Sequence, residues 1–224
     1  MTSVTFLNDA PTTSSHGAFV YRKHLCRASL NYPQCALALL GTCLRGEEVP
    51  FVFDPQPESW LRFREQVAAD LGINERELVV VGSGRLGYSL KPGNNLKAFT
   101  DRSDIDVVVV NARLFDELWM AFLSAVYPRH PATRHLGGWI SDRRSEIYTG
   151  YISPRDIQID SRIYGIRAKP VNQFRLHWFT TLKKASQHPP RRHSDVKARL
   201  YRTWRHAELY HSHSLTQLRT TLAN

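Results

Sequence analysis

Two segments of the chain carry its clearest pattern: Val79-Val80-Val81-Gly82-Ser83-Gly84-Arg85-Leu86-Gly87, and then Ser103-Asp104-Ile105-Asp106-Val107-Val108-Val109-Val110. The first contains most of a short apolar run, Leu78–Val81, whose length and β-branched residues predict a buried strand that stops at Gly82. The second is a β-branched run that opens with two aspartates separated by one residue. We therefore expect two buried strands, each with polar residues at one end.

The Gly-Ser turn after the first strand has the chemistry of a phosphate site. Glycines at 82, 84 and 87 allow backbone angles that other residues avoid, and they let a ligand approach the main chain. Ser83 offers a hydroxyl and an N–H group where a helix could begin. Unpaired N–H groups at such a turn suit phosphate oxygens, and Arg85 would add a planar, permanently charged donor. We predict that Gly82, Ser83, Gly84 and Arg85 contact phosphate.

The aspartate pair has the chemistry of a metal site. Because side chains alternate along a strand, Asp104 and Asp106 point to one face, and the apolar residues between and after them point to the other. Mg²⁺ favours hard oxygen ligands with substrate phosphates completing its shell. Two such ions roughly 3.5–4 Å apart can clamp the attacking and leaving oxygens of an in-line displacement. The sequence therefore predicts Asp104 and Asp106 as ligands of Mg²⁺ or Mn²⁺.

Either pattern alone is common without a catalytic role, because most Gly-Ser turns are only turns and most Asp-x-Asp pairs are solvated strand ends. In this order, however, the two patterns resemble the signature of the DNA polymerase β-like nucleotidyltransferase superfamily. Gly82 and Ser83 match its phosphate-binding Gly-Ser, and Asp104 and Asp106 match its metal carboxylates. The resemblance covers roughly residues 58–165. It implies an α/β (α+β) fold, in which a short mixed sheet is flanked by helices.

One departure from the family pattern is the spacing. There are 20 residues between Ser83 and Asp104, more than in compact members of the superfamily, and residues 91–95 have the composition of an inserted loop. The role of the loop over residues 91–100 stays open.

The resemblance also implies a reaction. An acceptor hydroxyl attacks the α-phosphorus of an NTP, and pyrophosphate leaves. Asp104 and Asp106 would hold the metal ions. Ser83, with the backbone from Gly82 to Arg85, would grip the β- and γ-phosphates. The acceptor (an RNA end, a nucleotide, a small molecule or a protein), the base and the oligomeric state stay open.

A non-catalytic nucleotide- or RNA-binding regulatory module is the alternative from a different functional class. In such a protein the same cleft would bind a nucleotide without turning it over. The two aspartates argue against this alternative, because a site that only binds an anion gains nothing from adjacent carboxylates.

A third carboxylate is expected at Asp160. The alternating residues 157–163 predict a half-buried strand with Asp160 on its polar face. Pairing of that strand beside the strand of the aspartate pair would aim Asp160 at the metal ions, where it would deprotonate or orient the acceptor. Glu146 and Asp156 are its competitors. Arg162 could instead hold Asp160 in a surface ion pair worth about 0–1 kcal/mol.

The composition is that of a basic globular chain. It has 224 residues, a net charge of +10 and an apolar fraction of 42%, which suit one domain or a catalytic core with an appendage. A polyanionic partner such as RNA fits this charge, although the basic residues are scattered, as in an ordinary basic protein. Cys26, Cys35 and Cys43 lack metal-ligand spacing and are expected to be reduced and buried. Without a signal-peptide pattern or a run of ~18 apolar residues, we expect a cytoplasmic protein that does not enter a membrane.

We expect three regions along the chain: a mobile tail over 1–18, a catalytic domain over 19–169 and a helical region over 170–224. In the catalytic domain, one helix should present four apolar residues at helical spacing before it ends at Gly72: Trp60, Phe63, Val67 and Leu71. Asn111 is predicted to cap another helix that ends before Pro128.

The C-terminal region is predicted to be helical. Ser194 and Asp195 suit the start of a long helix with four residues on one face: Val196, Leu200, Trp204 and Ala207. Tyr201 and Tyr210 could stack on a base, although packing is the more common role of such tyrosines. His206, His211 and His213 lack companions at metal spacing, so we do not expect a zinc site.

Overall fold

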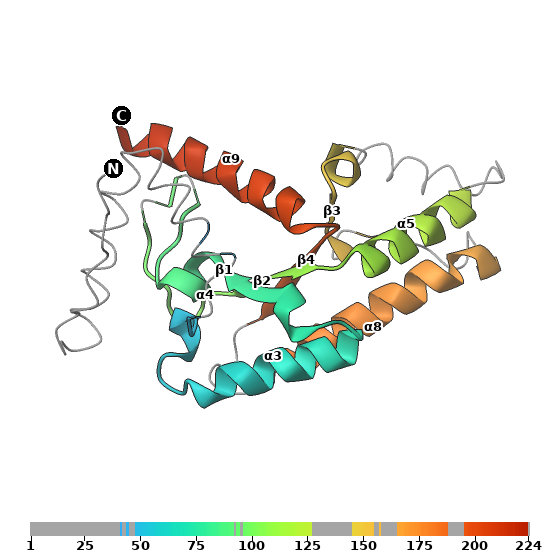
Figure 1. Ribbon diagram of the computed structural model, residues 1–224, viewed down its shortest axis with the longest axis horizontal. Coiled ribbons are helices and arrows are strands. Elements are labelled where there is room, and N and C mark those ends of the chain that lie inside the picture. Colours follow the sequence, from blue (N-terminus) through green and yellow to red (C-terminus); the bar gives the residue numbers. More distant parts are fainter. Residues whose placement is uncertain are drawn as a thin grey trace, which may run out of the picture.

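The structure is a computed structural model, and it describes residues 41, 44, 48–91, 93–94, 96–126, 145–154, 157, 165–187 and 195–223. The predicted tail over 1–18, the three cysteines, Asp156 and Asp160 lie outside these residues. Within them, the chain is a mixed α and β structure built on a four-stranded mixed sheet (Figure 1), which agrees with the predicted fold class. Among the described residues, no helix combines the length and the apolar character that crossing a bilayer requires.

The sheet has the strand order β1-β2-β4-β3. β1 (Leu78–Val81) runs antiparallel to β2 (Ile105–Val110), and β4 (Val196–Tyr201) runs parallel to β2 on its other side. The short β3 (Tyr151–Ile152) pairs antiparallel with the end of β4. The two strands predicted from their β-branched runs are thus confirmed, and they are neighbours.

Three helices cover one face of the sheet: α3 (Glu58–Leu71), α5 (Ala112–Val126) and α8 (Lys169–Ser186) (Figure 1). Alternate residues of β2 point into this core, which contains Ile105, Val107 and Val109. All four apolar residues predicted to line α3 are buried. Gly72 ends that helix with a left-handed φ of +64°, as predicted. Among the described residues, three short 3₁₀ turns accompany these elements: η1 (Phe51–Phe53), η2 (Glu75–Glu77) and η5 (Gly165–Ala168).

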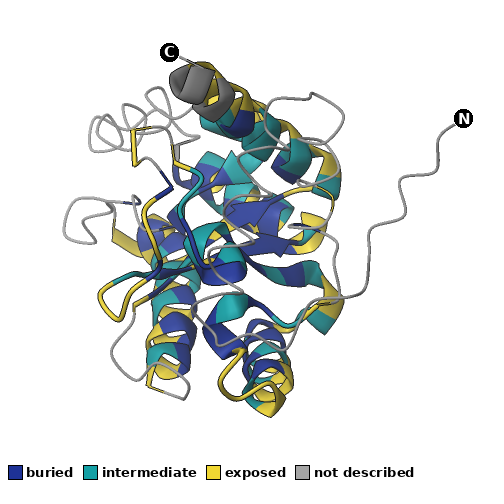
Figure 2. Ribbon diagram, turned by 90° about the vertical axis from the view of Figure 1, so that its left-hand side faces the viewer, coloured by how far each residue is buried: buried dark blue, intermediate teal, exposed yellow. Residues whose placement is uncertain are grey.

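The opposite face has a smaller core under α9 (Trp204–Ala223) and beside α4 (Gly82–Leu86). Val108 and Val110 of β2 meet Ala207 and Leu215 of α9 there. Tyr201 is fully buried in this core, which confirms the packing role predicted for it. Figure 2 shows that the buried residues concentrate in the strands and on the inner sides of the helices.

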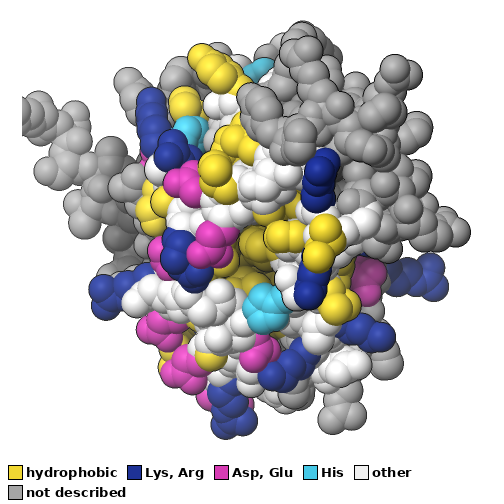
Figure 3. Space-filling view, turned by 90° about the vertical axis from the view of Figure 1, so that its right-hand side faces the viewer, with side chains coloured by type: hydrophobic (Ala, Val, Ile, Leu, Met, Phe, Trp, Pro, Cys, Tyr) yellow, Lys and Arg dark blue, Asp and Glu magenta, His cyan; other side chains and the backbone are white. Residues whose placement is uncertain are grey.

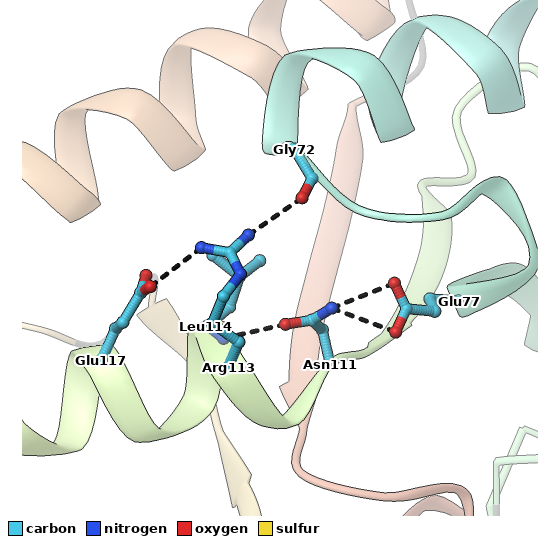
Figure 4. A network of polar contacts seen from close by, with 6 residues as sticks. All are labelled: Gly72, Glu77, Asn111, Arg113, Leu114 and Glu117. Atoms are coloured by element: carbon cyan, nitrogen blue, oxygen red, sulfur yellow. Dashed lines mark hydrogen bonds and ion pairs between the residues drawn. The ribbon is translucent and has the colours of Figure 1, made fainter.

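Asn111 caps α5, as predicted (Figure 4). Its Oδ1 accepts a hydrogen bond from the N–H of Leu114 at 2.8 Å, and its Nδ2 donates to both carboxylate oxygens of Glu77 at 3.0 Å. The neighbouring Arg113 donates to the carbonyl of Gly72 at 2.9 Å. These contacts tie the start of α5 to the segment that enters β1. They therefore hold the last residues of β2 beside the first residues of β1.

The C-terminal region differs from the prediction. Four apolar residues between Val196 and Ala207 predicted one long helix, but residues 196–201 form β4, and α9 begins only at Trp204. The prediction was wrong because Val196, Ala198 and Leu200 also alternate as in a strand, and hydrogen bonding to β2 decides between the two patterns. A strand inside the sheet therefore separates two helices in a region that was expected to be helical throughout.

Candidate functional site

The Gly-Ser turn and the aspartate pair meet at the end of β1. In the antiparallel register, Val81 lies opposite Asp106, so the turn begins beside that carboxylate. The two groups are close, because a Cβ atom placed on Gly82 would lie 3.8 Å from Oδ2 of Asp106. Gly82 has a φ of +62°, which favours glycine. Any other residue here would be strained and would extend toward the carboxylate.

Ser83 opens the short helix α4 directly after this turn. Its carbonyl accepts a hydrogen bond from the N–H of Gly87 at 2.8 Å, and Gly87 ends α4 with a φ of +86°. Ser83 is half-buried, and its hydroxyl makes no hydrogen bond to another described residue. The predicted phosphate contact of Ser83 stays a prediction, and the side chain has the exposure that such a contact needs.

Two members of the predicted phosphate loop have packing roles. Gly84 is buried, and a Cβ there would lie 3.2 Å from Cγ1 of Val80, so glycine lets α4 pack closely on β1. Arg85 is only 7% exposed, and its guanidinium donates to the backbone carbonyl of Glu48. The phosphate contacts predicted for Gly84 and Arg85 stay predictions.

Asp104 and Asp106 lie on the face of the sheet opposite the α3, α5 and α8 core, as the alternation predicted. Asp104 immediately precedes β2 and forms an ion pair with Lys197 of β4. The side chains of this pair are 40% and 37% exposed. Asp106 lies between the Gly82 turn on one side and Lys197, its register partner in β4, on the other.

Sequence reasoning missed two basic residues of β4. Lys197 and Arg199 share the face of the aspartate pair, because they alternate with the apolar residues of their strand. The guanidinium carbon of Arg199 lies 5.3 Å from the centre of the Tyr210 ring, and its charge also acts on Asp106. The signal was present in the alternation of apolar and basic residues over 196–200, but the helix prediction obscured it.

The pKa of Asp106 is raised above its ordinary value, mainly because packing removes water from the carboxyl. The positive charge of Arg199 opposes this rise in pKa, and the negative charge of Asp104 adds to it. Asp106 still keeps exposed surface, so the desolvation acts on part of the side chain. A raised carboxyl pKa means that the folded protein stabilises the charged carboxylate less well than water does. A cation beside Asp104 and Asp106 would supply the missing stabilisation.

Both edges of β2 are paired, one with β1 and the other with β4. The predicted strand over 157–163, with Asp160, lies outside the described residues except for Ile157.

Of the two competitors of Asp160, only Glu146 is among the described residues. Glu146 makes a side-chain hydrogen bond with Tyr151. Across the described residues, no group of three or more His, Cys, Asp or Glu side chains is placed to hold a metal ion. The carboxylates described at the site are Asp104 and Asp106.

A pocket of about 180 Å³ lies beside Asp106. Its polar lining comes from Asp106, Lys197, Arg199 and Ser153, and apolar residues of the sheet and α8 complete it. Ligand pockets commonly measure about 300–1,000 Å³. The pocket is smaller than that range, and residues from both faces of the sheet line it.

An aromatic cluster stands behind Arg199. Tyr151, Tyr201 and Tyr210 pack with ring centres 5.0–6.0 Å apart, and His211 packs against Tyr210 at 5.3 Å. Burial, aided by the charge of Arg199, lowers the pKa of His211 to about 4, and burial raises the pKa of Tyr151 to about 12. These two residues are therefore neutral near pH 7.

The site thus combines a glycine turn, two carboxylates and two basic side chains at one end of β2. Comparisons of the chain with protein-family models, with curated proteins and with solved structures found no match.

Proposed function

We propose that the chain is a metal-dependent nucleotidyltransferase of the polymerase β-like type, which moves an NMP from an NTP to an acceptor hydroxyl and releases pyrophosphate. One observation carries the proposal: the Gly-Ser turn begins directly beside Asp106, because Val81 and Asp106 are register partners. A reaction at phosphorus needs phosphate-binding groups and metal ligands within reach of one another.

Asp104 and Asp106 would hold Mg²⁺ or Mn²⁺. Their chemistry fits such an ion, because both offer carboxylate oxygens, and a bound cation would stabilise the charged form of Asp106, whose pKa is raised mainly by desolvation. When bound, the ion supplies charge neutralisation at the reacting phosphate. Asp160 stays the predicted third carboxylate.

The protein's own groups would position the nucleotide. The Gly82 backbone and the Ser83 hydroxyl would contact the β- and γ-phosphates, and Lys197 and Arg199 add positive charge on the same face of the sheet. The buried Arg85 would position the turn by bonding to the Glu48 carbonyl. Most of the rate acceleration would come from positioning and from electrostatic stabilisation.

The alternative is a non-catalytic module that binds a nucleotide or RNA and regulates another process. The two carboxylates beside the turn weigh against it. Without a cation between them, Asp104 and Asp106 would repel the triphosphate that the turn is suited to bind. A site selected only to bind an anion has no use for that repulsion.

The salt dependence of RNA binding tests whether the acceptor is RNA. The net charge of +10 favours an RNA acceptor, whereas Figure 3 shows one face on which Lys and Arg side chains are interspersed with acidic and apolar ones. Binding of an RNA acceptor should weaken steeply with salt, because bound phosphates release counterions. Negligible binding of oligonucleotides even at ~50 mM salt would favour a small-molecule or protein acceptor.

Incubation with each α-³²P-labelled NTP and Mg²⁺ or Mn²⁺, with and without RNA, tests the proposal. We expect metal-dependent transfer of label to RNA, to a nucleotide or to protein, and its loss in Asp106→Asn. Tight NTP binding without metal, with no transfer to any acceptor, would instead support the binding module.

A further inference from the structure

The acidic pair faces a basic pair on the neighbouring strand. Asp104 forms an ion pair with Lys197, 93 positions later in the chain. Among the charged groups that act on Asp106, Arg199 has the largest effect. The parallel register of β2 and β4 produces this match, because Lys197 lies opposite Asp106 and Arg199 follows on the same face.

The two basic residues differ in their partners. Arg199 is exposed and lies over the Tyr210 ring. The Lys197 side chain is 37% exposed and forms an ion pair with Asp104, whose side chain is 40% exposed. A lysine ammonium is a compact charge on a flexible stem, without the fixed fork of a guanidinium. An ion pair of this kind contributes little to stability, so a competing cation can break it.

We propose that Lys197 is a positioning residue that competes with the divalent cation for Asp104 and, once displaced, binds the triphosphate of the nucleotide. This inference rests on the metal site of the proposed function. A cation that coordinates Asp104 must replace the ammonium there. The displaced side chain stays on the face of the Gly82 turn, where nucleotide phosphates would lie.

The consequence is a coupling between cation and nucleotide. A cation alone must break the ion pair and binds weakly. When a nucleotide is present, the displaced ammonium gains a phosphate partner, so each ligand favours the other. Such coupling is reciprocal. Lys197 would thereby keep the carboxylates from binding a cation fully before the nucleotide arrives.

Binding of Mn²⁺ to the full chain, measured by electron paramagnetic resonance, tests the inference without any turnover. In Lys197→Met, we expect Mn²⁺ alone to bind about three- to tenfold more tightly, because its competitor is gone. An NTP analogue with a methylene group between the α- and β-phosphates, titrated at saturating Mn²⁺, should bind about three- to tenfold more weakly. Lys197→Arg keeps the charge and should lie closer to the wild type in both measurements.

Lys91→Met is the matched control for charge alone. Lys91 also acts on Asp106 through its charge, but its side chain is exposed and forms no ion pair with Asp104. We expect both affinities to change less than about twofold in this variant, because an exposed charge is screened by salt. Equal effects of Lys91→Met and Lys197→Met would show that only the loss of a positive charge matters, and this result would overturn the inference.

Two failures can be told apart. If Mn²⁺ binds the wild type no better than Asp106→Asn, the metal site and the proposed function both fail. If Mn²⁺ binding requires Asp106 but is identical in Lys197→Met and the wild type, only the present inference fails.

Lysine acetylation of the wild type, read by mass spectrometry, keeps the test decisive should Lys197→Met not fold. Added Mn²⁺ should raise the reactivity of Lys197 severalfold by freeing its ammonium. Lys184, which pairs with Asp70 at 3.0 Å in another part of the molecule, should not change. Unchanged or reduced reactivity of Lys197 would overturn the inference.

Discussion

Side chains on the two faces of β2 differ in exposure and in charge. Toward α3, α5 and α8, the side chains of Ile105, Val107 and Val109 are at most 3% exposed. On the other face, Asp104, just before β2, and Asp106 keep contact with solvent, whereas Val108 and Val110 are buried in the smaller core. Burial of apolar area stabilises a fold by roughly 25 cal/mol per Å², whereas an exposed ion pair contributes only about 0–1 kcal/mol. Stability and the proposed chemistry should therefore respond to different substitutions.

The largest effect is expected on the charged face. The double variant Asp104→Asn, Asp106→Asn should lose NMP transfer by about a thousandfold, because the metal ligands act on charge that develops in the transition state. Its free energy of unfolding should change by less than about 1 kcal/mol, because the Asp104–Lys197 pair is exposed. Transfer rates and urea denaturation measure the two quantities. Full transfer by a folded double variant would remove the carboxylates from the mechanism.

Substitutions on the apolar face should lower the free energy of unfolding and leave the metal site unchanged. Phe122→Ala empties a fully buried position in α5 and should lower the free energy of unfolding by about 3–5 kcal/mol. Met120→Ala, in the same helix but 56% exposed, should change it by less than about 0.5 kcal/mol. Mn²⁺ affinity per folded molecule should be unchanged in both variants. Weakened Mn²⁺ binding in folded Phe122→Ala would show that the two faces are coupled.

A smaller effect is expected for two glycines with positive φ, one packed against His206 of α9 and one in open space. Gly150 has a φ of +78°, and a Cβ there would lie 2.2 Å from the His206 ring. Gly150→Ala should cost about 2–3 kcal/mol, from backbone strain and from the clash. Gly93 has a similar φ of +83°, but no described atom lies within 4 Å of its Cβ position, so Gly93→Ala should cost only about 1 kcal/mol. Urea denaturation of both variants measures the two losses of unfolding free energy. Gly150→Ala in a His206→Ala background shows how much of its loss comes from the clash with the ring. Equal losses for the two glycine variants would contradict a clash at Gly150.

The smallest effect concerns pH. Burial lowers the pKa of His211 to about 4 in the folded protein, while an unfolded chain titrates near 6.5. Between these values the unfolded state binds the proton more strongly, so stability should fall as the pH drops from 6.5 toward 4 and level off below that. The loss between pH 7 and pH 5 should be about 1–2 kcal/mol smaller in His211→Phe, and unchanged in the exposed His213→Gln. An identical pH dependence in wild type and His211→Phe would place the titration elsewhere.

The sequence pattern correctly predicted those elements that depend only on residues close by in the chain. β1, the turn at Gly82, the buried stripe of α3 and the Asn111 cap depend on neighbours within a few positions. The features that sequence reasoning missed depend on distant partners. β4 is a strand because β2 bonds to it, and Lys197 meets Asp104 only through that pairing. Arg85 looks like a phosphate ligand in the sequence, but the carbonyl that it contacts belongs to Glu48, 37 positions earlier.

The position of β4 has a consequence for synthesis. It lies between β2 and β3 in the sheet, yet it is the last of these four strands to leave the ribosome. Until residue 201 has been made, one edge of β2 is unpaired, and an unpaired apolar edge invites association with other chains. The nascent protein would also carry Asp104 before Lys197 exists to pair with it. The site should therefore mature late, when the C-terminal segment closes the sheet, and a chain truncated after α8 should aggregate.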